Sequence, residues 1–244
     1  MRVPFAIQRH LPEQQPRIKV RGLVFHSIVG SAEAAYGLFL NSSSLESTFI
    51  IKLDGTIYQI MESDERADAN GLGNAYYASV ETEDNGDPNH MPWTPQQMDS
   101  MVRLALWYHQ NHGVPLARIP AHGGYGFGWH VMHGLDHHEG GQTYKKGPSP
   151  WTGVKGKTCP GLVRQHQFDR VVLPRIIGQD TGEEYMPDEK FFRGETDRLI
   201  AAVREETARS IQDRGSRLFR VNNSIKAILA YLKARFGTVP SSDA

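Results

Sequence analysis

The order of strand-like and helix-like segments along this 244-residue chain predicts an α/β fold, a central mixed β-sheet flanked by helices. Two observations lead to this prediction. Runs rich in β-branched and aromatic residues occur at 21–27, 47–60 and 77–83. Helix-like segments that begin with a capping residue lie between and after these runs, at 32–40 and 94–112.

A change of composition near residue 178 indicates a second part of the chain. We expect residues 1–178 to form a first domain and residues 179–244 to form a C-terminal helical extension. The segment 195–236 is charged and helix-rich. Four of its apolar residues recur at intervals of seven: Ile211, Leu218, Ile225 and Leu232. This pattern fits a helix that mediates homo-oligomerisation and equally a helical hairpin packed on the first domain.

Charge and composition argue against several classes of partner. The 27 Lys and Arg residues balance the 27 Asp and Glu residues, so the overall charge attracts neither nucleic acid nor an anionic membrane. The hydrophobic content of 39% is sufficient for a folded core. The sequence shows no signal peptide and no membrane-spanning run, so we expect a protein made in the cytoplasm without membrane insertion.

Two of the strand-like runs carry candidate functional residues. The run 21–27 has His26 near its end, where it could enter a site or be a buried core histidine. The run 77–83 alternates, so Glu81 could point into a cleft or, on an edge strand, face solvent.

Turn and cap signals locate the elements between these strands. Asp54-Gly55 divides the run 47–60 into two halves and is a strong β-hairpin signal. Ser31 is placed to cap the first predicted helix, and Thr94, followed by Pro and then Gln, to cap the second.

The second half of the chain begins with a segment, 123–133, in which Gly alternates with aromatic residues. This segment is strand-like, and its glycines permit close backbone approach. We expect a long polar loop at 134–156 and a closing helix at 162–177, with Pro174 marking a kink or an end.

Cys159 is the only cysteine, so it cannot form an intrachain disulfide. Lys157 precedes it by two residues and Pro160-Gly161 follow it, which places the sulfur in a polar turn. Packing, metal ligation and nucleophilic chemistry are the uses open to this residue. The histidines that precede it favour metal ligation, because a thiolate with imidazoles suits zinc held by three protein ligands.

In their order along the chain, these features resemble the type-2 zinc-dependent N-acetylmuramoyl-L-alanine amidases. That family includes phage endolysins and is similar in fold to peptidoglycan recognition proteins. The resemblance covers roughly residues 20–178 and is strongest to amidases of phages that infect actinobacteria. The features that carry it are His26, the Asp54-Gly55 hairpin, the strand with Glu81, the Thr-Pro-x-Gln helix, His130, and Lys157-x-Cys159-Pro160-Gly161.

The resemblance implies a set of zinc ligands. His26 matches the first ligand of the family, and Cys159 matches the last, which other members replace with Asp. His130 fits the second ligand best because it follows Gly-Phe-Gly-Trp, and His133 is the reserve candidate.

The resemblance also implies catalytic roles. Glu81 matches an acid that some members use as a proton shuttle, and Lys157 matches the family's catalytic lysine. Where some phage members have a catalytic Tyr, this chain has Ser47. The implied reaction is hydrolysis of the amide between the lactyl group of N-acetylmuramic acid and the L-alanine of the stem peptide. The implied partner is therefore peptidoglycan, through its glycan strand and stem peptide.

The implied biological role is host-cell lysis. An endolysin without a signal peptide would be made in the host cytoplasm and would reach the cell wall through a holin-type pore. Two other functions stay open. A non-catalytic recognition module would bind peptidoglycan without cutting it, and a cysteine peptidase would use Cys159 as its nucleophile.

Overall fold

The structure is a computed structural model, and it describes residues 1–178 except 13, 43 and 140. The predicted helical extension at 179–244, with its apolar repeat in 195–236, lies outside the described residues, so the domain boundary and the oligomerisation segment stay predictions. Among the described residues, none of the helices combines the length and apolarity needed to cross a bilayer.

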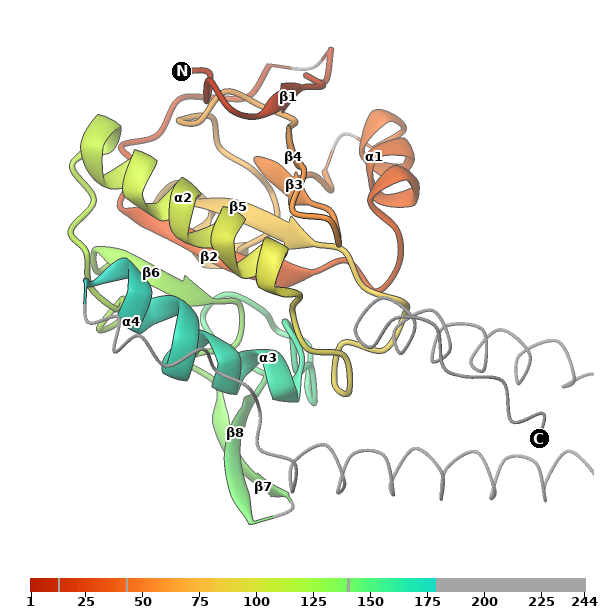
Figure 1. Cartoon of the computed structure of the whole chain (residues 1–244), viewed down its shortest axis with the longest axis vertical. Helices are drawn as coiled ribbons and strands as arrows, with labels where there is room; N and C mark the ends of the chain where they lie inside the picture. Colours follow the sequence, from red (N-terminus) through yellow and green to blue (C-terminus); the bar gives the residue numbers. More distant parts are fainter. Residues whose placement is uncertain (13, 43, 140, 179–244) are drawn as a thin grey trace, which may run out of the picture. The chain divides into compact units, whose positions relative to one another are not determined.

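A six-stranded mixed sheet forms the centre of the described fold (Figure 1). Its strands follow the order β1-β4-β3-β5-β2-β6. Only β3 and β4 pair antiparallel, and every other neighbouring pair is parallel. The strands are β1 (Ile7–Gln8), β2 (Gly22–Ser27), β3 (Phe49–Ile51), β4 (Ile57–Gln59), β5 (Tyr77–Thr82) and β6 (Gly126–Trp129). The predicted mixed sheet flanked by helices is therefore confirmed.

Local signals in the sequence placed several elements correctly. The β3–β4 hairpin turns at Gly55, whose φ of +83° suits glycine. Helix α1 (Ala32–Leu40) begins after Ser31, whose hydroxyl accepts a hydrogen bond from the backbone N–H of Ala34 at 3.2 Å. Helix α2 (Pro95–His112) begins with a complete capping box between Thr94 and Gln97.

The two faces of the sheet are covered by different helices. Along β3, Phe49 and Ile51 pack into the cluster that contains the apolar face of α2, whereas Ile50 packs with α1 residues. This alternation follows from the two-residue period of a strand. Figure 1 shows α2 lying across the strands β5 and β2. The sheet is therefore buried on both sides, which accounts for its largely apolar central strands.

The predicted closing helix is present as three consecutive helical segments. They are α3 (Leu162–Gln167), a π-helical turn η2 (Phe168–Val172) and α4 (Leu173–Ile176). Pro174 lies in the first turn of α4, where a missing N–H is tolerated. Arg175 of α4 donates to Asp99 of α2 at 2.7 Å, so the closing segment lies against α2.

The predicted polar loop at 134–156 differs from the structure. It contains a separate two-stranded hairpin, β7 (Leu135–Glu139) and β8 (Gln142–Lys146). The pattern of the sequence does not reveal it because the residues of this hairpin are mostly polar and do not alternate with apolar ones. The strand predicted within 123–133 is also shorter, since β6 ends at Trp129.

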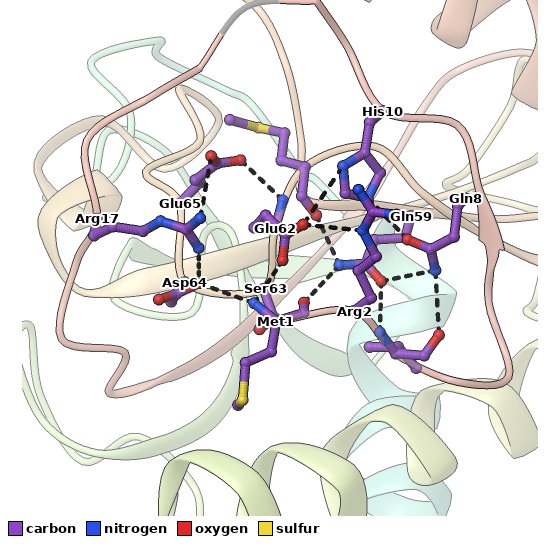
Figure 2. A network of polar contacts seen from close by, with 12 residues as sticks. Met1, Arg2, Gln8, His10, Arg17, Gln59, Glu62, Ser63, Asp64 and Glu65 are labelled. Atoms are coloured by element: carbon purple, nitrogen blue, oxygen red, sulfur yellow. Dashed lines mark hydrogen bonds and ion pairs between the residues drawn. The ribbon is translucent and has the colours of Figure 1, made fainter.

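The N-terminal segment lies at the β4 edge of the sheet and is held by polar contacts (Figure 2). The α-amino group of Met1 lies 2.7 Å from a carboxylate oxygen of Glu62 and 3.1 Å from one of Asp64. In β4, Gln59 accepts a hydrogen bond from the backbone N–H of Val3 at 2.7 Å. The same segment adds β1 alongside β4, so β1 forms the outer strand of the sheet opposite β6.

The glycine after the Cys-Pro pair generates a prediction about stability. Gly161 has a φ of +114°, and a Cβ there would lie 2.0 Å from the carbonyl oxygen of Pro88. Gly161→Ala should lower the free energy of unfolding by about 2–4 kcal/mol, through backbone strain and overpacking. Urea denaturation of the full chain measures this change. Gly153→Ala is the control, because a Cβ at Gly153 meets nothing within 4 Å. Equal stability of the two variants would contradict the prediction.

Candidate active site

Three neighbouring parallel strands, β5, β2 and β6, have their carboxyl ends side by side along one edge of the sheet. The main candidate residues lie at these carboxyl ends. His26 of β2 is the register partner of Glu81 of β5. His130 is the first residue after β6, and its backbone N–H donates to the carbonyl of Phe25 at 3.2 Å. The carboxyl ends of parallel strands are where α/β folds commonly place their sites. Because β5 lies between β3 and β2, the alternative of Glu81 as a solvent-facing acid on an edge strand is wrong.

The Cys159 loop closes over this edge. The carbonyl of Cys159 accepts a hydrogen bond from the backbone N–H of Val131 at 3.3 Å, which ties the loop to the segment that carries His130. The Sγ atom of Cys159 lies 3.8 Å from Nδ1 of His26, although the two residues are far apart in the sequence.

We call His26, His130 and Cys159 the His-His-Cys group. Their potential ligand atoms all lie within 4.8 Å of one another, and the two imidazole centroids are 4.3 Å apart. His133, the reserve candidate, is not part of this group; its ring packs edge-on against Trp151 at 4.9 Å.

Both imidazoles of the group use Nε2 for a hydrogen bond. His26 Nε2 lies 2.7 Å from Oδ1 of Asn70, and His130 Nε2 lies 2.9 Å from the carbonyl oxygen of Trp151. In His130 the buried Nδ1 has no hydrogen-bond partner among the described residues. From the sequence alone neither Asn70 nor Trp151 is assigned a role at the site, because neither lies in a recognisable metal or catalytic motif.

The donor set fits zinc. Tetrahedral zinc bonds to sulfur at about 2.3 Å and to imidazole nitrogen at about 2.0–2.1 Å, which puts the two ligand atoms roughly 3.6 Å apart. The observed separation of 3.8 Å between Cys159 Sγ and His26 Nδ1 is close to this value. Two imidazole nitrogens and one sulfur leave a fourth tetrahedral position free of protein ligands.

Burial controls the protonation of the group. It lowers the pKa of His26 well below its ordinary value and, with help from the charge of Lys157, lowers the pKa of His130 to about 4. Burial raises the pKa of the Cys159 thiol to about 12. At neutral pH both imidazoles are therefore uncharged and available as ligands, while the thiol must lose a proton to bind a metal.

Glu81 lies beside the group with an unusual acidity. Its Oε1 is 3.8 Å from Nδ1 of His26, and its Oε2 is buried without a hydrogen-bond partner among the described residues. Burial raises the pKa of Glu81 to about 7, and the charges of Lys157 and Arg164 oppose this rise. A carboxyl group with a pKa near neutrality can both accept and release a proton.

A buried ion pair lies beside the carboxyl ends of β2 and β5. Arg164 of α3 is fully buried, and its guanidinium lies 3.7 Å from a carboxylate oxygen of Asp84. It also donates to the hydroxyls of Ser27 and Thr82, each at 3.0 Å. No pattern in the sequence indicates that this arginine is buried, because a charged residue in an amphipathic helix is usually exposed.

The remaining predicted residues are not part of the His-His-Cys group. Lys157 is partly exposed, and its charge is near enough to lower the pKa values of His130 and Glu81. Ser47 is buried just before β3. Trp93 and Trp129 are buried in the core.

Comparisons with known proteins identify a family that matches this chain. A family model described as N-acetylmuramoyl-L-alanine amidase matches residues 16–162. No curated protein matches the chain significantly.

Three solved structures with similar folds have low identity to the chain. N-acetylmuramoyl-L-alanine amidase LysC from Clostridium intestinale is 17% identical, with a TM-score of 0.45 over 68% of this chain and 94% of that one. The hydrolase AmiA from Staphylococcus aureus, in complex with its ligand, is 14% identical, with a TM-score of 0.41 over 54% and 67%. Peptidoglycan recognition protein-LE, in complex with tracheal cytotoxin, is 10% identical, with a TM-score of 0.48 over 68% and 94%.

These three TM-scores are all below 0.5. The family model, in contrast, spans more than half of the chain and includes His26, Glu81, His130 and Cys159. The chain belongs to the N-acetylmuramoyl-L-alanine amidase family.

Proposed function

We propose that this protein is a zinc-dependent peptidoglycan hydrolase that cuts the amide between N-acetylmuramic acid and the L-alanine of the stem peptide. Membership of the amidase family supports the choice of bond. The observation that carries the proposal is the meeting of the His-His-Cys group with Glu81 at one sheet edge. Three zinc donors beside a carboxyl group with a pKa near neutrality form the arrangement that metal-assisted amide hydrolysis needs.

In this proposal His26, His130 and Cys159 hold the zinc ion. When bound, zinc would supply Lewis acidity, which would polarise the amide carbonyl and make the attacking water more acidic. Glu81 takes the proton of the attacking water and passes it to the leaving amine of L-alanine. Lys157 stabilises the negative charge that develops on the carbonyl oxygen, a contribution of about 3 kcal/mol for a single such donor.

The cysteine peptidase alternative is disfavoured by the acidity of the thiol. A nucleophilic cysteine works as a thiolate and normally has a depressed pKa. Burial instead raises the pKa of Cys159 to about 12, so the metal-free thiol is protonated at neutral pH. The non-catalytic recognition module is disfavoured by Glu81, because binding peptidoglycan alone does not need a buried acid beside zinc donors.

The biological setting stays a prediction from the resemblance in sequence. It comprises an endolysin of the bacteriophage kind, synthesis in the host cytoplasm, release through a holin-type pore and host-cell lysis. Homo-oligomerisation through residues 195–236 is likewise a prediction, because this segment lies outside the described residues.

Removal of a proposed ligand should abolish metal binding and hydrolysis together. We expect His26→Ala and Cys159→Ala to purify without stoichiometric zinc and to release no new muramyl lactyl groups or L-alanine amino termini from cell walls. Elemental analysis and mass spectrometry of the products measure the two effects. A chelator should inactivate the wild type reversibly. Full activity of zinc-free His26→Ala, or inactivation by thiol alkylation with no response to chelator, would favour the cysteine peptidase. Full activity of Cys159→Ala would contradict both the zinc site and the cysteine peptidase.

Replacing Glu81 separates metal binding from turnover. Glu81→Gln keeps the size of the side chain and removes its ability to shuttle a proton, so zinc content should stay at the wild-type level. The rate constant kcat should fall by about 10²–10⁴-fold, the usual contribution of general acid–base catalysis. Asp99→Asn, an exposed change on α2, is the matched control and should keep the wild-type rate. A wild-type rate in Glu81→Gln would move the proton shuttle to another residue.

Zinc binding should release a proton from Cys159. Because burial raises the pKa of this thiol to about 12 and holds both imidazole pKa values low, the thiol is the one ligand that must deprotonate. The apparent association constant should therefore rise about tenfold per pH unit between about pH 7.5 and about pH 8.5. Calorimetry in buffers of different ionisation enthalpy counts the protons released. Cys159→Asp should release about one proton fewer, and proton release equal in both proteins would contradict this expectation.

A further inference from the structure

We propose that Asn70 and the segment around Trp151 form a two-part clamp that fixes both imidazoles of the His-His-Cys group in the Nε2–H tautomer. The clamp turns both Nδ1 lone pairs toward the metal position and couples the two rings to each other. Asn70 and Trp151 are then positioning residues. Only the identity of the metal, zinc, rests on the proposed function; the tautomers and the coupling do not.

The first part of the clamp is the side-chain amide of Asn70, which is fully buried. Its Nδ2 donates to the carbonyl of Tyr77 at 3.2 Å, so its Oδ1 must be the atom that lies 2.7 Å from His26 Nε2. The backbone N–H of Asn70 donates to Oδ1 of Asn74 at 2.6 Å and holds the loop in place. An amide oxygen only accepts hydrogen bonds, so His26 carries its proton on Nε2.

The second part is the backbone carbonyl of Trp151, which lies 2.9 Å from His130 Nε2. A carbonyl also accepts only, so His130 too carries its proton on Nε2. The Trp151 side chain anchors this carbonyl: it is buried, it packs against the ring of Tyr77 at 5.1 Å, and its Nε1 donates to His122 Nδ1 at 3.0 Å. The ring therefore fixes the position of a backbone atom that touches the site.

The two parts of the clamp pack directly on each other. A Cβ on Gly71, the neighbour of Asn70, would lie 2.7 Å from the same Trp151 carbonyl oxygen that accepts from His130. A Cβ on Gly73 would lie 2.9 Å from the Trp151 indole ring. The backbone N–H of Leu72 donates to the carbonyl of Pro150 at 3.2 Å. Because the two segments are in close contact at these points, we expect a shift of one acceptor to displace the other.

Metal binding depends on a free lone pair at Nδ1 of each imidazole. If the acceptor beside Nε2 is lost, an imidazole can turn over or move its proton to Nδ1, where it blocks the ligand atom. Loss of such outer contacts typically weakens metal binding by about 10–100-fold. A residue that merely supports the fold would change stability without changing the tautomer of a particular histidine.

The experiment combines histidine ¹⁵N NMR of the metal-free protein with competition titrations of zinc chloride against a chromophoric chelator. In the wild type both His26 and His130 should show the Nε2–H tautomer. Asn70→Leu should move His26 toward the Nδ1–H form and raise the zinc dissociation constant by about 10–100-fold. Asn70→Asp keeps an acceptor and should retain the Nε2–H form and a dissociation constant within about threefold of wild type. Asp99→Asn, an exposed change on α2, contacts neither part of the clamp and should leave both tautomers unchanged.

The variant Gly71→Ala tests whether the two parts of the clamp are coupled. The added methyl group meets the backbone of Trp151 and touches neither His26 nor His130. It should broaden or shift the ring signals of His130 and of His26 together. Two results would overturn the clamp. One is an Nδ1–H form of His26 or His130 in the wild-type protein. The other is an Asn70→Leu variant whose His26 tautomer and zinc affinity equal those of the wild type. An unchanged His130 signal in Gly71→Ala would overturn the coupling. If the wild type shows the Nε2–H forms but binds no zinc, the proposed function fails while the clamp stands.

Discussion

The site depends on one constraint, the parallel alignment of β5, β2 and β6. Their shared direction puts Glu81, His26 and His130 at one edge, and backbone hydrogen bonds between the strands hold these positions in register. The Cys159 loop needs only to close over that edge to bring its sulfur within 3.8 Å of His26. A slip of one residue in any of the three strands would turn its side chain to the other face of the sheet, so the pairing register of the sheet is also the geometry of the site.

Burial then decides what these groups can do. The same exclusion of water lowers the pKa values of two imidazoles and raises those of a thiol and a carboxyl group, because it disfavours the charged form of each. A metal cation would reverse part of this cost by neutralising the thiolate. Arg164 and Asp84 form a buried ion pair next to the site. Glu81 Oε2 nevertheless has no hydrogen-bond partner among the described residues. The site is therefore arranged for a cation and a mobile proton.

The predictions that succeeded rest on local physics. The Asp54-Gly55 hairpin and the two capped helices follow from turn and cap chemistry within a few residues, and the structure places them as expected. The β7–β8 hairpin was not predicted, since polar strands that bury little apolar surface leave no periodic pattern. The roles of Asn70 and Trp151 were not predicted for a different reason: they come from contacts with His26 and His130, which lie 44 and 21 residues away in the chain.

The sequence by itself determined the fold class, the candidate donors and the family resemblance, because strand and helix patterns and the order of His26, His130 and Cys159 are readable in one dimension. Only the tertiary structure decided which histidine accompanies the sulfur. His130 directly follows β6 and faces His26, whereas His133, three residues later, packs on Trp151. The choice depends on where the strand ends and on which acceptor holds each ring. Both are long-range properties, set by packing between segments that are distant in the chain.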